Sequence, residues 1–236
     1  MAQTWRHLLF AHWPVPFSVL RPLVPPALTL ETFDGDAWLA VTPFVATVRA
    51  RTLPAIPGLG HFAELNVRTY VTLGERPGVY FFSLDAADAL AVAVARALYS
   101  LRYFRARFRV ATGSALIDYE SRRTHRGAAP ATFSGSYGPT GPVAAAPPGT
   151  LAHWLTERYC LYAIGRRGRV RRAEIHHPPW PLQPADVEIR RNTMTRGLGF
   201  ELSPAPPVVH FSARLDVAVW PPETVLLSGD PSATAD

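Results

Sequence analysis

Apolar and polar residues alternate without a break along residues 64–71, which read ELNVRTYV. A period of two predicts an extended strand with two unlike faces. One face is apolar or β-branched, as in a protein core: Leu65, Val67, Thr69 and Val71. The other face carries an acid, an amide, a guanidinium and a phenol: Glu64, Asn66, Arg68 and Tyr70. The pattern raises the question of whether this polar face meets solvent or lines a pocket.

Similar alternation predicts about nine strands, most of them paired as hairpins across short turns. One strand runs through Trp38, Ala40 and Thr42 after a turn at Asp34-Gly35. The others cover residues 64–73, 79–86, 103–110, 114–123, 131–138, 156–164, 169–177 and 208–220. The proline-rich residues 178–191 predict instead a loop that leads into a turn.

Helices are short and few in the predicted structure. Residues 86–101 have helical spacing and many alanines, and either Asp85, just before them, or Asp88, near their start, can cap the helix. Short helices are expected near residues 17–23, where Pro25 and Pro26 end the first, and after Thr150, which can cap the second. Residues 53–60 are expected to form a loop.

These elements predict a β-dominated α+β fold in which an antiparallel barrel encloses a pocket, because ring closure removes exposed strand edges. The Pro/Gly/Ala-rich residues 138–149 are the only candidate linker, and composition does not change across them. We therefore expect one domain over residues 1–227 and a disordered tail over residues 228–236.

Composition narrows the classes of function. Of the 236 residues, 48% are hydrophobic and 18% are charged, which suits a folded core. The single cysteine, Cys160, excludes an internal disulfide and a cysteine-cluster metal site. No apolar run reaches the roughly 18 residues that a membrane helix needs, and no signal peptide is evident. A cytoplasmic protein without membrane contact is expected.

All 24 basic residues are arginine, so no side chain can form a Schiff base, and no P-loop lysine exists. The formal net charge is +6, and the arginines cluster at residues 166–172, RRGRVRR. We interpret this cluster as the solvated tip of a hairpin and expect no nucleic-acid partner, because no nucleic-acid-binding motif surrounds it.

Several long stretches, in order, resemble one family of bacterial proteins. They are FAHWPVP, LRPLVPPALTLETFDGDAWLAVTPF, FAELNVRTYV, GVYFFSLDA, GTLAHWLTERYCLY and IHHPPWPLQ. Together they resemble the YqjF-like or DUF2071 family over residues 4–220. That family is similar in fold to acetoacetate decarboxylase, so the resemblance implies a mostly antiparallel β-barrel with a buried pocket.

Acetoacetate decarboxylase has a Y-x-E strand whose glutamate lines the pocket, and Phe62-Ala63-Glu64 matches that pattern here. It also has an arginine followed seven residues later by a reactive lysine. Here Arg96 is followed at that spacing by Tyr103, and both lysines of the decarboxylase motif are missing. The resemblance therefore implies a pocket glutamate without the lysine nucleophile, and a decarboxylase of that mechanism is not expected.

Glu64 is the leading site candidate, as an acid or base in a pocket or as a strand acid paired with an arginine. Burying a carboxylate is costly unless it is paired, and we expect Arg158 as its partner because Arg68 lies about 13 Å along the strand. Arg68, beside Asn66, either holds an anionic ligand or cross-links strands. Tyr70 is expected at the pocket rim.

Tyr103 either donates a hydrogen bond to a ligand carbonyl or fills space. Of the adjacent His176 and His177, one is expected to reach the pocket; His176 stands among the candidate pocket residues, and the sequence leaves open which of the two faces inward. Neighbouring strand residues point to opposite faces, and no metal-binding spacing occurs, so neither a metal nor a cofactor is expected. Cys160 is expected in the core.

Two functions fit this set of residues. The first is a small-molecule-binding protein whose ligand is a carbonyl or carboxylate compound. The alternative is an enzyme that works by acid–base chemistry alone, a lyase, hydratase or isomerase with Glu64 as the acid or base. A weaker third interpretation is a structural protein that fills its own cavity. The sequence leaves open whether the chain forms a homo-oligomer.

Overall fold

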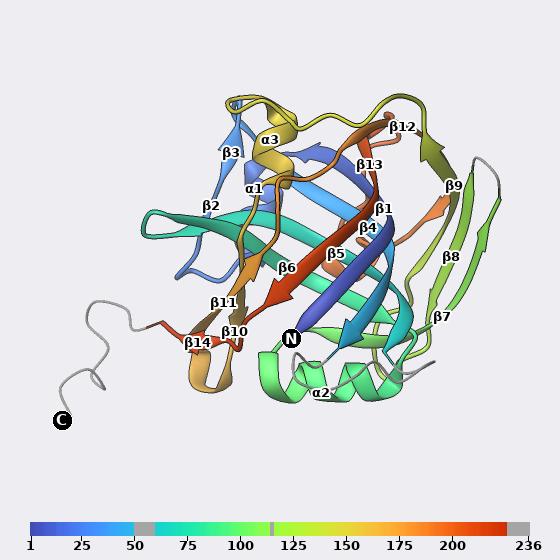
Figure 1. The fold of residues 1–236 in the computed structure, drawn as a ribbon. Helices are drawn as coiled ribbons and strands as arrows, with labels where there is room; N and C mark the ends of the chain where they lie inside the picture. The colour runs from blue at the N-terminus through green and yellow to red at the C-terminus, as the bar shows by residue number, and fades with distance from the viewer. Residues whose placement is uncertain (50–59, 114–115, 226–236) are drawn as a thin grey trace.

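The computed structural model describes residues 1–49, 60–113 and 116–225, and strands dominate it (Figure 1). The described residues form strands β1 Ala2–Val15, β2 Thr29–Leu30, β3 Thr32–Phe33, β4 Asp36–Arg49, β5 His61–Leu73, β6 Arg76–Ala86, β7 Tyr103–Thr112, β8 Ile117–Arg123, β9 Thr132–Pro139, β10 Cys160–Ile164, β11 Val170–His176, β12 Gln183–Asn192, β13 Val208–Val219 and β14 Glu223–Thr224. The α-helices are α1 Phe17–Leu20, α2 Ala89–Tyr99 and α3 Leu151–Thr156. Figure 1 shows α2 and α3 at opposite ends of the strands.

The strands close on themselves, as the barrel prediction requires. Pairing runs from β6 through β7, β8, β9, β12, β13, β1, β4 and β5, and β5 pairs again with β6. A second ring of paired strands runs from β6 through β10, β11, β13, β1, β4 and β5, and β5 pairs with β6 to close it. Neighbours are antiparallel except that β6 runs parallel to both β7 and β10.

The two rings share β13, β1, β4, β5 and β6, so these strands separate two interiors. Each interior has its own apolar cluster: one contains Leu65 and Val67, and the other contains Phe44 and Leu84. A strand between two interiors is covered on both faces. This explains why the polar face of β5 is enclosed, with Glu64 6% exposed and Arg68 8% exposed.

Most sequence-predicted elements are confirmed. The pairs β5–β6, β7–β8 and β10–β11 form antiparallel hairpins. The first short helix is α1, continued by a 3₁₀ turn at Arg21–Leu23, and Thr150 caps α3 by accepting from His153 N. Residues 53–59 of the predicted loop, residues 114–115 of a predicted strand and the tail at 228–236 lie outside the described residues.

Two long strands, β1 and β12, were not predicted, and neither were the two-residue strands β2, β3 and β14. Residues 178–191 were expected to form a loop and a turn, but residues 183–192 form β12, which pairs with β9 and β13. Its apolar and polar residues do alternate, and the prolines before it concealed that signal. Strand β1 was missed because it is buried on both faces and its register shifts after Arg6, beside His7 with a φ of 54°. No helix in the described parts of the chain is long and apolar enough to cross a membrane.

Candidate functional site

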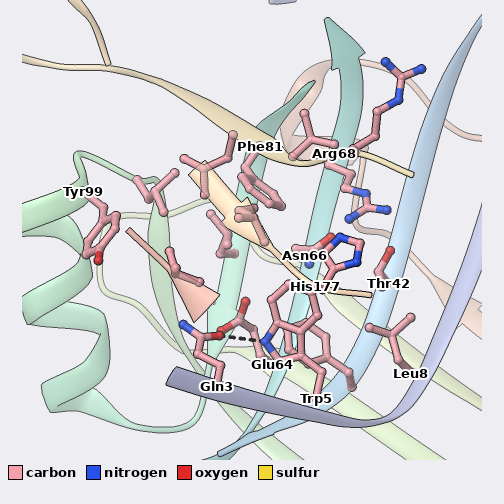
Figure 2. A pocket seen from close by; sticks show the side chains of 18 of the residues that line it. Gln3, Trp5, Leu8, Thr42, Glu64, Asn66, Arg68, Phe81, Tyr99 and His177 are labelled. Carbon is pink, nitrogen blue, oxygen red and sulfur yellow. Dashed lines mark hydrogen bonds between the residues drawn. The ribbon is translucent and has the colours of Figure 1, made fainter. Parts of the chain in front are cut away.

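The second ring encloses a cavity of about 90 Å³, shown in Figure 2. Every strand of that ring contributes to its wall, together with the segment from Tyr99 to Tyr103 and the turns on either side of the β10–β11 hairpin. The wall is largely aromatic and aliphatic. Polar side chains of β5 interrupt it at three successive inward positions: Glu64, Asn66 and Arg68. The residues that the sequence placed on one face therefore meet one enclosed space.

Glu64 is the buried acid of this cavity. It lies opposite Phe44 of β4 and Ala86 of β6, and the Tyr103 hydroxyl donates a hydrogen bond to its Oε2 at 3.1 Å. The pKa of Glu64 is raised from 4.5 to about 8: burial is the main cause, the Tyr103 hydrogen bond opposes the rise, and the nearby Asp85 carboxylate adds to it. The carboxyl is therefore mostly protonated at neutral pH.

The prediction that Arg158 pairs with Glu64 was wrong. Arg158 lines the same cavity, but it follows α3 rather than lying on a strand. Its Nη1 lies 2.5 Å from Oε2 of Glu31, and its Nε donates to the Trp154 carbonyl at 2.7 Å. Glu64 meets the cost of burial by staying protonated, not by pairing with a cation.

Arg68 has no such carboxylate. Within the described residues no acidic side chain pairs with it, and its buried Nε has no hydrogen-bond partner. Its guanidinium lies 5.2 Å from the Phe10 ring centroid and 5.9 Å from that of Tyr70, and aromatic faces of this kind attract cations only weakly. Figure 2 shows it beside Asn66 and His177. The cavity thus holds a desolvated positive charge without a counterion among the described residues.

Tyr70 was expected at the rim, and this was wrong. Its side chain is fully buried, with 0% exposure, because β5 is covered on both faces. Its ring contacts Trp154 and lies 5.2 Å from the Arg158 guanidinium as well as near Arg68. Tyr70 therefore packs against Arg68 and Arg158 in the protein interior and does not border the opening of the cavity.

The choice of His176 as a cavity residue was also wrong. His176 is the last residue of β11, is exposed and packs against Trp220. His177 lines the cavity, stacked on Tyr159 at 4.6 Å, and burial lowers its pKa. Residue alternation predicted that only one of the two would face inward, but choosing between them requires the register of β11.

Sequence reasoning missed other cavity residues. Thr42 lies opposite Asn66, and Trp180 has a buried indole N–H that finds no partner in the described parts of the chain. Thr42 was missed because the sequence analysis did not predict the pairing of β4 with β5, which places it beside Asn66. Phe81 and Leu84 share the cavity face although they are three residues apart, because the β5–β6 register shifts between Val67 and Arg68.

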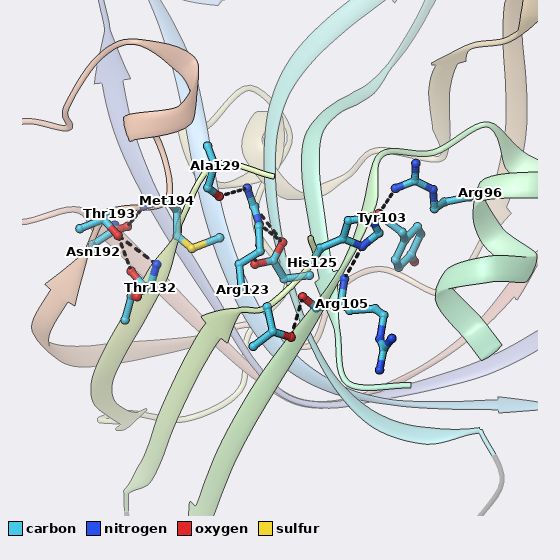
Figure 3. A network of polar contacts seen from close by, with 12 residues as sticks. Arg96, Tyr103, Arg105, Arg123, His125, Ala129, Thr132, Asn192, Thr193 and Met194 are labelled. Carbon is cyan, nitrogen blue, oxygen red and sulfur yellow. Dashed lines mark hydrogen bonds and ion pairs between the residues drawn. The ribbon is translucent and has the colours of Figure 1, made fainter. Parts of the chain in front are cut away.

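Tyr103 is held in place from α2. Arg96 donates to its backbone carbonyl at 2.8 Å, and Figure 3 shows this contact beside the ion pair of Arg123. The α2–β7 connection thereby fixes the phenol against Glu64. The alternative that Tyr103 only fills space does not account for its hydrogen bond to that carboxyl.

We expect Tyr103→Phe to raise the pKa of Glu64 further, because the lost hydrogen bond stabilises the ionised carboxylate. A charged hydrogen bond of ordinary strength corresponds to a midpoint about one pH unit higher. Carbon-13 NMR of labelled glutamate carboxyls measures this midpoint. Tyr159→Phe, which removes a hydroxyl bonded to the half-buried Glu157, is the control and should leave the Glu64 midpoint unchanged.

Comparison with known proteins gives one family and one relative in sequence. The DUF2071 family model, described as an uncharacterized conserved protein, matches residues 2–216. "Uncharacterized protein YqjF" of Bacillus subtilis (strain 168) is 46% identical over 222 residues, which cover 94% of this chain and 90% of the relative.

Solved structures extend the likeness at the level of the fold. The enduracididine biosynthesis enzyme MppR, complexed with pyruvate, superposes with a TM-score of 0.66 at 12% identity, covering 94% of this chain and 89% of that one. An acetoacetate decarboxylase from Legionella pneumophila gives 0.63 at 13% identity, covering 95% and 87%. Identities this low establish the shared fold, which is acetoacetate-decarboxylase-like, as the sequence resemblance implied.

Proposed function

The chain belongs to the DUF2071 family, and we propose that it binds a small organic carboxylate in the cavity lined by Glu64, Asn66 and Arg68 of β5. We call this space the β5 cavity. The observation that carries the proposal is Arg68, a guanidinium only 8% exposed that pairs with no carboxylate among the described residues. An unpaired buried charge costs several kcal/mol. A bound anion would supply the missing partner, and guanidinium groups bind carboxylates in a bidentate geometry.

The rest of the wall suits such a ligand. Three buried polar atoms on the same wall have no hydrogen-bond partner among the described residues: Asn66 Oδ1, Thr42 Oγ1 and Trp180 Nε1. A volume of about 90 Å³ has room for a few water molecules or one small acid. The MppR structure of the same fold is complexed with pyruvate, and a 2-oxo acid of that size supplies both a carboxylate and a carbonyl.

We expect pyruvate to raise the thermal midpoint of the wild-type chain and Arg68→Met to weaken its binding by about 10- to 100-fold, the equivalent of a charged hydrogen bond. Methionine fills similar space without charge, so the unliganded variant should be at least as stable as the wild type. Isothermal titration calorimetry measures the affinity, and differential scanning calorimetry measures the stability.

Two controls separate specific binding from general charge effects. Pyruvamide has the carbonyl but not the charge, and should bind the wild type and Arg68→Met equally weakly. Arg214→Met removes an exposed arginine and should leave pyruvate binding unchanged. If a panel of small carboxylates leaves the thermal midpoint unmoved, or if Arg68→Met binds them as well as the wild type, the proposal is wrong.

A second candidate function, acid–base catalysis, is favoured by the state of Glu64. A carboxyl with a pKa of about 8 that faces a cavity can both give and take a proton near neutral pH. No residue of the chain is lysine, so decarboxylation through a Schiff base has no side-chain nucleophile here. Proton transfer next to a ligand carbonyl, as in lyase, hydratase or isomerase chemistry, needs none.

Exchange of the pyruvate methyl protons in D₂O tests this second function. We expect the wild type to accelerate the exchange seen by proton NMR, and Glu64→Gln to remove the acceleration while keeping the affinity for pyruvate. Binding without accelerated exchange in the wild type would favour a binding protein that does not catalyse this reaction. Equal exchange by Glu64→Gln and the wild type would exclude Glu64 as the base.

A further inference from the structure

Arginines surround a second hollow, away from the β5 cavity. An open groove of about 690 Å³ lies between the C-terminal half of α2, the tip of the β10–β11 hairpin and β14. Its charged lining residues are all arginines: Arg96, Arg167, Arg169 and Arg171. We name these four residues and the space between them the arginine groove.

No carboxylate of the described residues forms an ion pair with the arginines of the arginine groove. On the same strand, Arg172 pairs with Glu174 at 2.9 Å. Within the described residues, none of the four groove arginines has such a pair. Arg171 instead donates to neutral oxygens, the Leu98 carbonyl at 2.7 Å and the Pro222 carbonyl at 3.1 Å. Within the part of the chain that the structure describes, the positive charge of the groove therefore has no paired carboxylate.

The groove is also built with backbone constraints. A Cβ at Gly165 would lie 2.9 Å from Cδ of Arg171, so the absent side chain makes room for the arginine stem. Arg167 has a φ of 60°, a left-handed conformation that costs a residue with a side chain about 1–3 kcal/mol. Arg96 is anchored by its bond to the Tyr103 carbonyl. The left-handed conformation of Arg167, next to Gly168 with a φ of 74°, is that of a tight hairpin turn, so the Gly165 contact and the Arg96 anchor are the features that hold arginines at the groove.

We propose that the arginine groove binds a compound that carries a short phosphate chain, such as a di- or triphosphate. Several guanidinium groups around one hollow match the several anionic oxygens of such a chain. A nucleic-acid strand would need a basic track along many phosphates, whereas the neighbouring Arg76 and Arg172 are already paired with Glu174. The charge is confined to a groove of small-molecule size.

Calorimetric titration with inorganic triphosphate at physiological salt tests this proposal. We expect saturable binding by the wild type and at least about tenfold weaker binding by the double variant Arg167→Gln/Arg169→Gln, which loses two charged contacts. Neither side chain makes a described hydrogen bond, so the variant should fold normally, as circular dichroism can verify. The matched control is Arg107→Gln/Arg109→Gln, which removes the same charge from β7.

The outcomes separate a built site from general electrostatics. Retained affinity in the β7 control together with loss in the groove variant supports the site. Equal weakening in both variants would mean that only net charge attracts the anion, and would overturn the proposal. Absence of triphosphate binding would also overturn it, as would tighter binding of a single-stranded oligonucleotide through the same two arginines. Pyruvate binding is measured separately, so failure here leaves the β5 cavity proposal intact.

Discussion

We expect the wild-type chain to lose about 3–4 kcal/mol of stability relative to Glu64→Gln as the pH rises from 5 to 9. The pKa of Glu64 is about 8 in the folded chain and has its ordinary value of 4.5 when the chain is unfolded. Between these values the folded state keeps a proton that the unfolded state has released. Stability therefore falls as the pH rises through this window, and glutamine removes the titration while keeping the shape.

Urea denaturation of both proteins at pH 5, 7 and 9 measures this difference. Glu201→Gln, which changes an exposed glutamate paired with Arg196, is the control and should follow the wild type at every pH apart from a small constant offset. Parallel stability curves for the wild type and Glu64→Gln would show that Glu64 titrates in the folded chain as it does in water, and the enclosed neutral carboxyl would then be rejected.

The alternation along residues 64–71 predicted both the strand and its enclosed polar face. That inference succeeded because the signal is local: a period of two assigns each residue to a face whatever the strand pairs with. Because the strand carries polar groups on one face and apolar groups on the other, we interpreted the polar face as the lining of a cavity. The structure adds the reason, which is that β5 separates two interiors and has no solvent-facing side.

What the sequence did not reveal depends on contacts between distant segments. Arg158 pairs with Glu31 across 127 positions of the chain, and no local pattern specifies that choice over Glu64. The shift in register near Arg68 changes which residues of β6 face the cavity. The irregularity at His7 likewise shifts the register of β1 against β4 and so changes which residues of β1 lie on each face. A regular alternation therefore assigns the wrong face beyond each irregularity, as it does for residues such as Phe81.

The largest loss of stability is expected from Arg123→Met, at about 3–5 kcal/mol. Arg123 Nη2 lies 2.8 Å from Oδ1 of Asp85, whose side chain is 0% exposed. Removing the guanidinium leaves a carboxylate in the protein interior without its cation. Arg214→Met breaks a pair with Asp216 in which both side chains are more than half exposed, and should cost less than about 1 kcal/mol. Chemical denaturation at pH 7 compares the two variants.

Two further measurements identify the buried charge as the cause. Burial already raises the pKa of Asp85, while Arg123 opposes that effect, so Arg123→Met should raise the pKa further and destabilise the fold more at pH 8 than at pH 5. The double variant Asp85→Asn/Arg123→Met, which leaves no charge behind, should recover part of the lost stability. If the double variant recovers no stability relative to Arg123→Met, the unpaired Asp85 carboxylate is not the cause of the loss, and the contact of the Arg123 guanidinium with the Phe104 ring accounts for it instead.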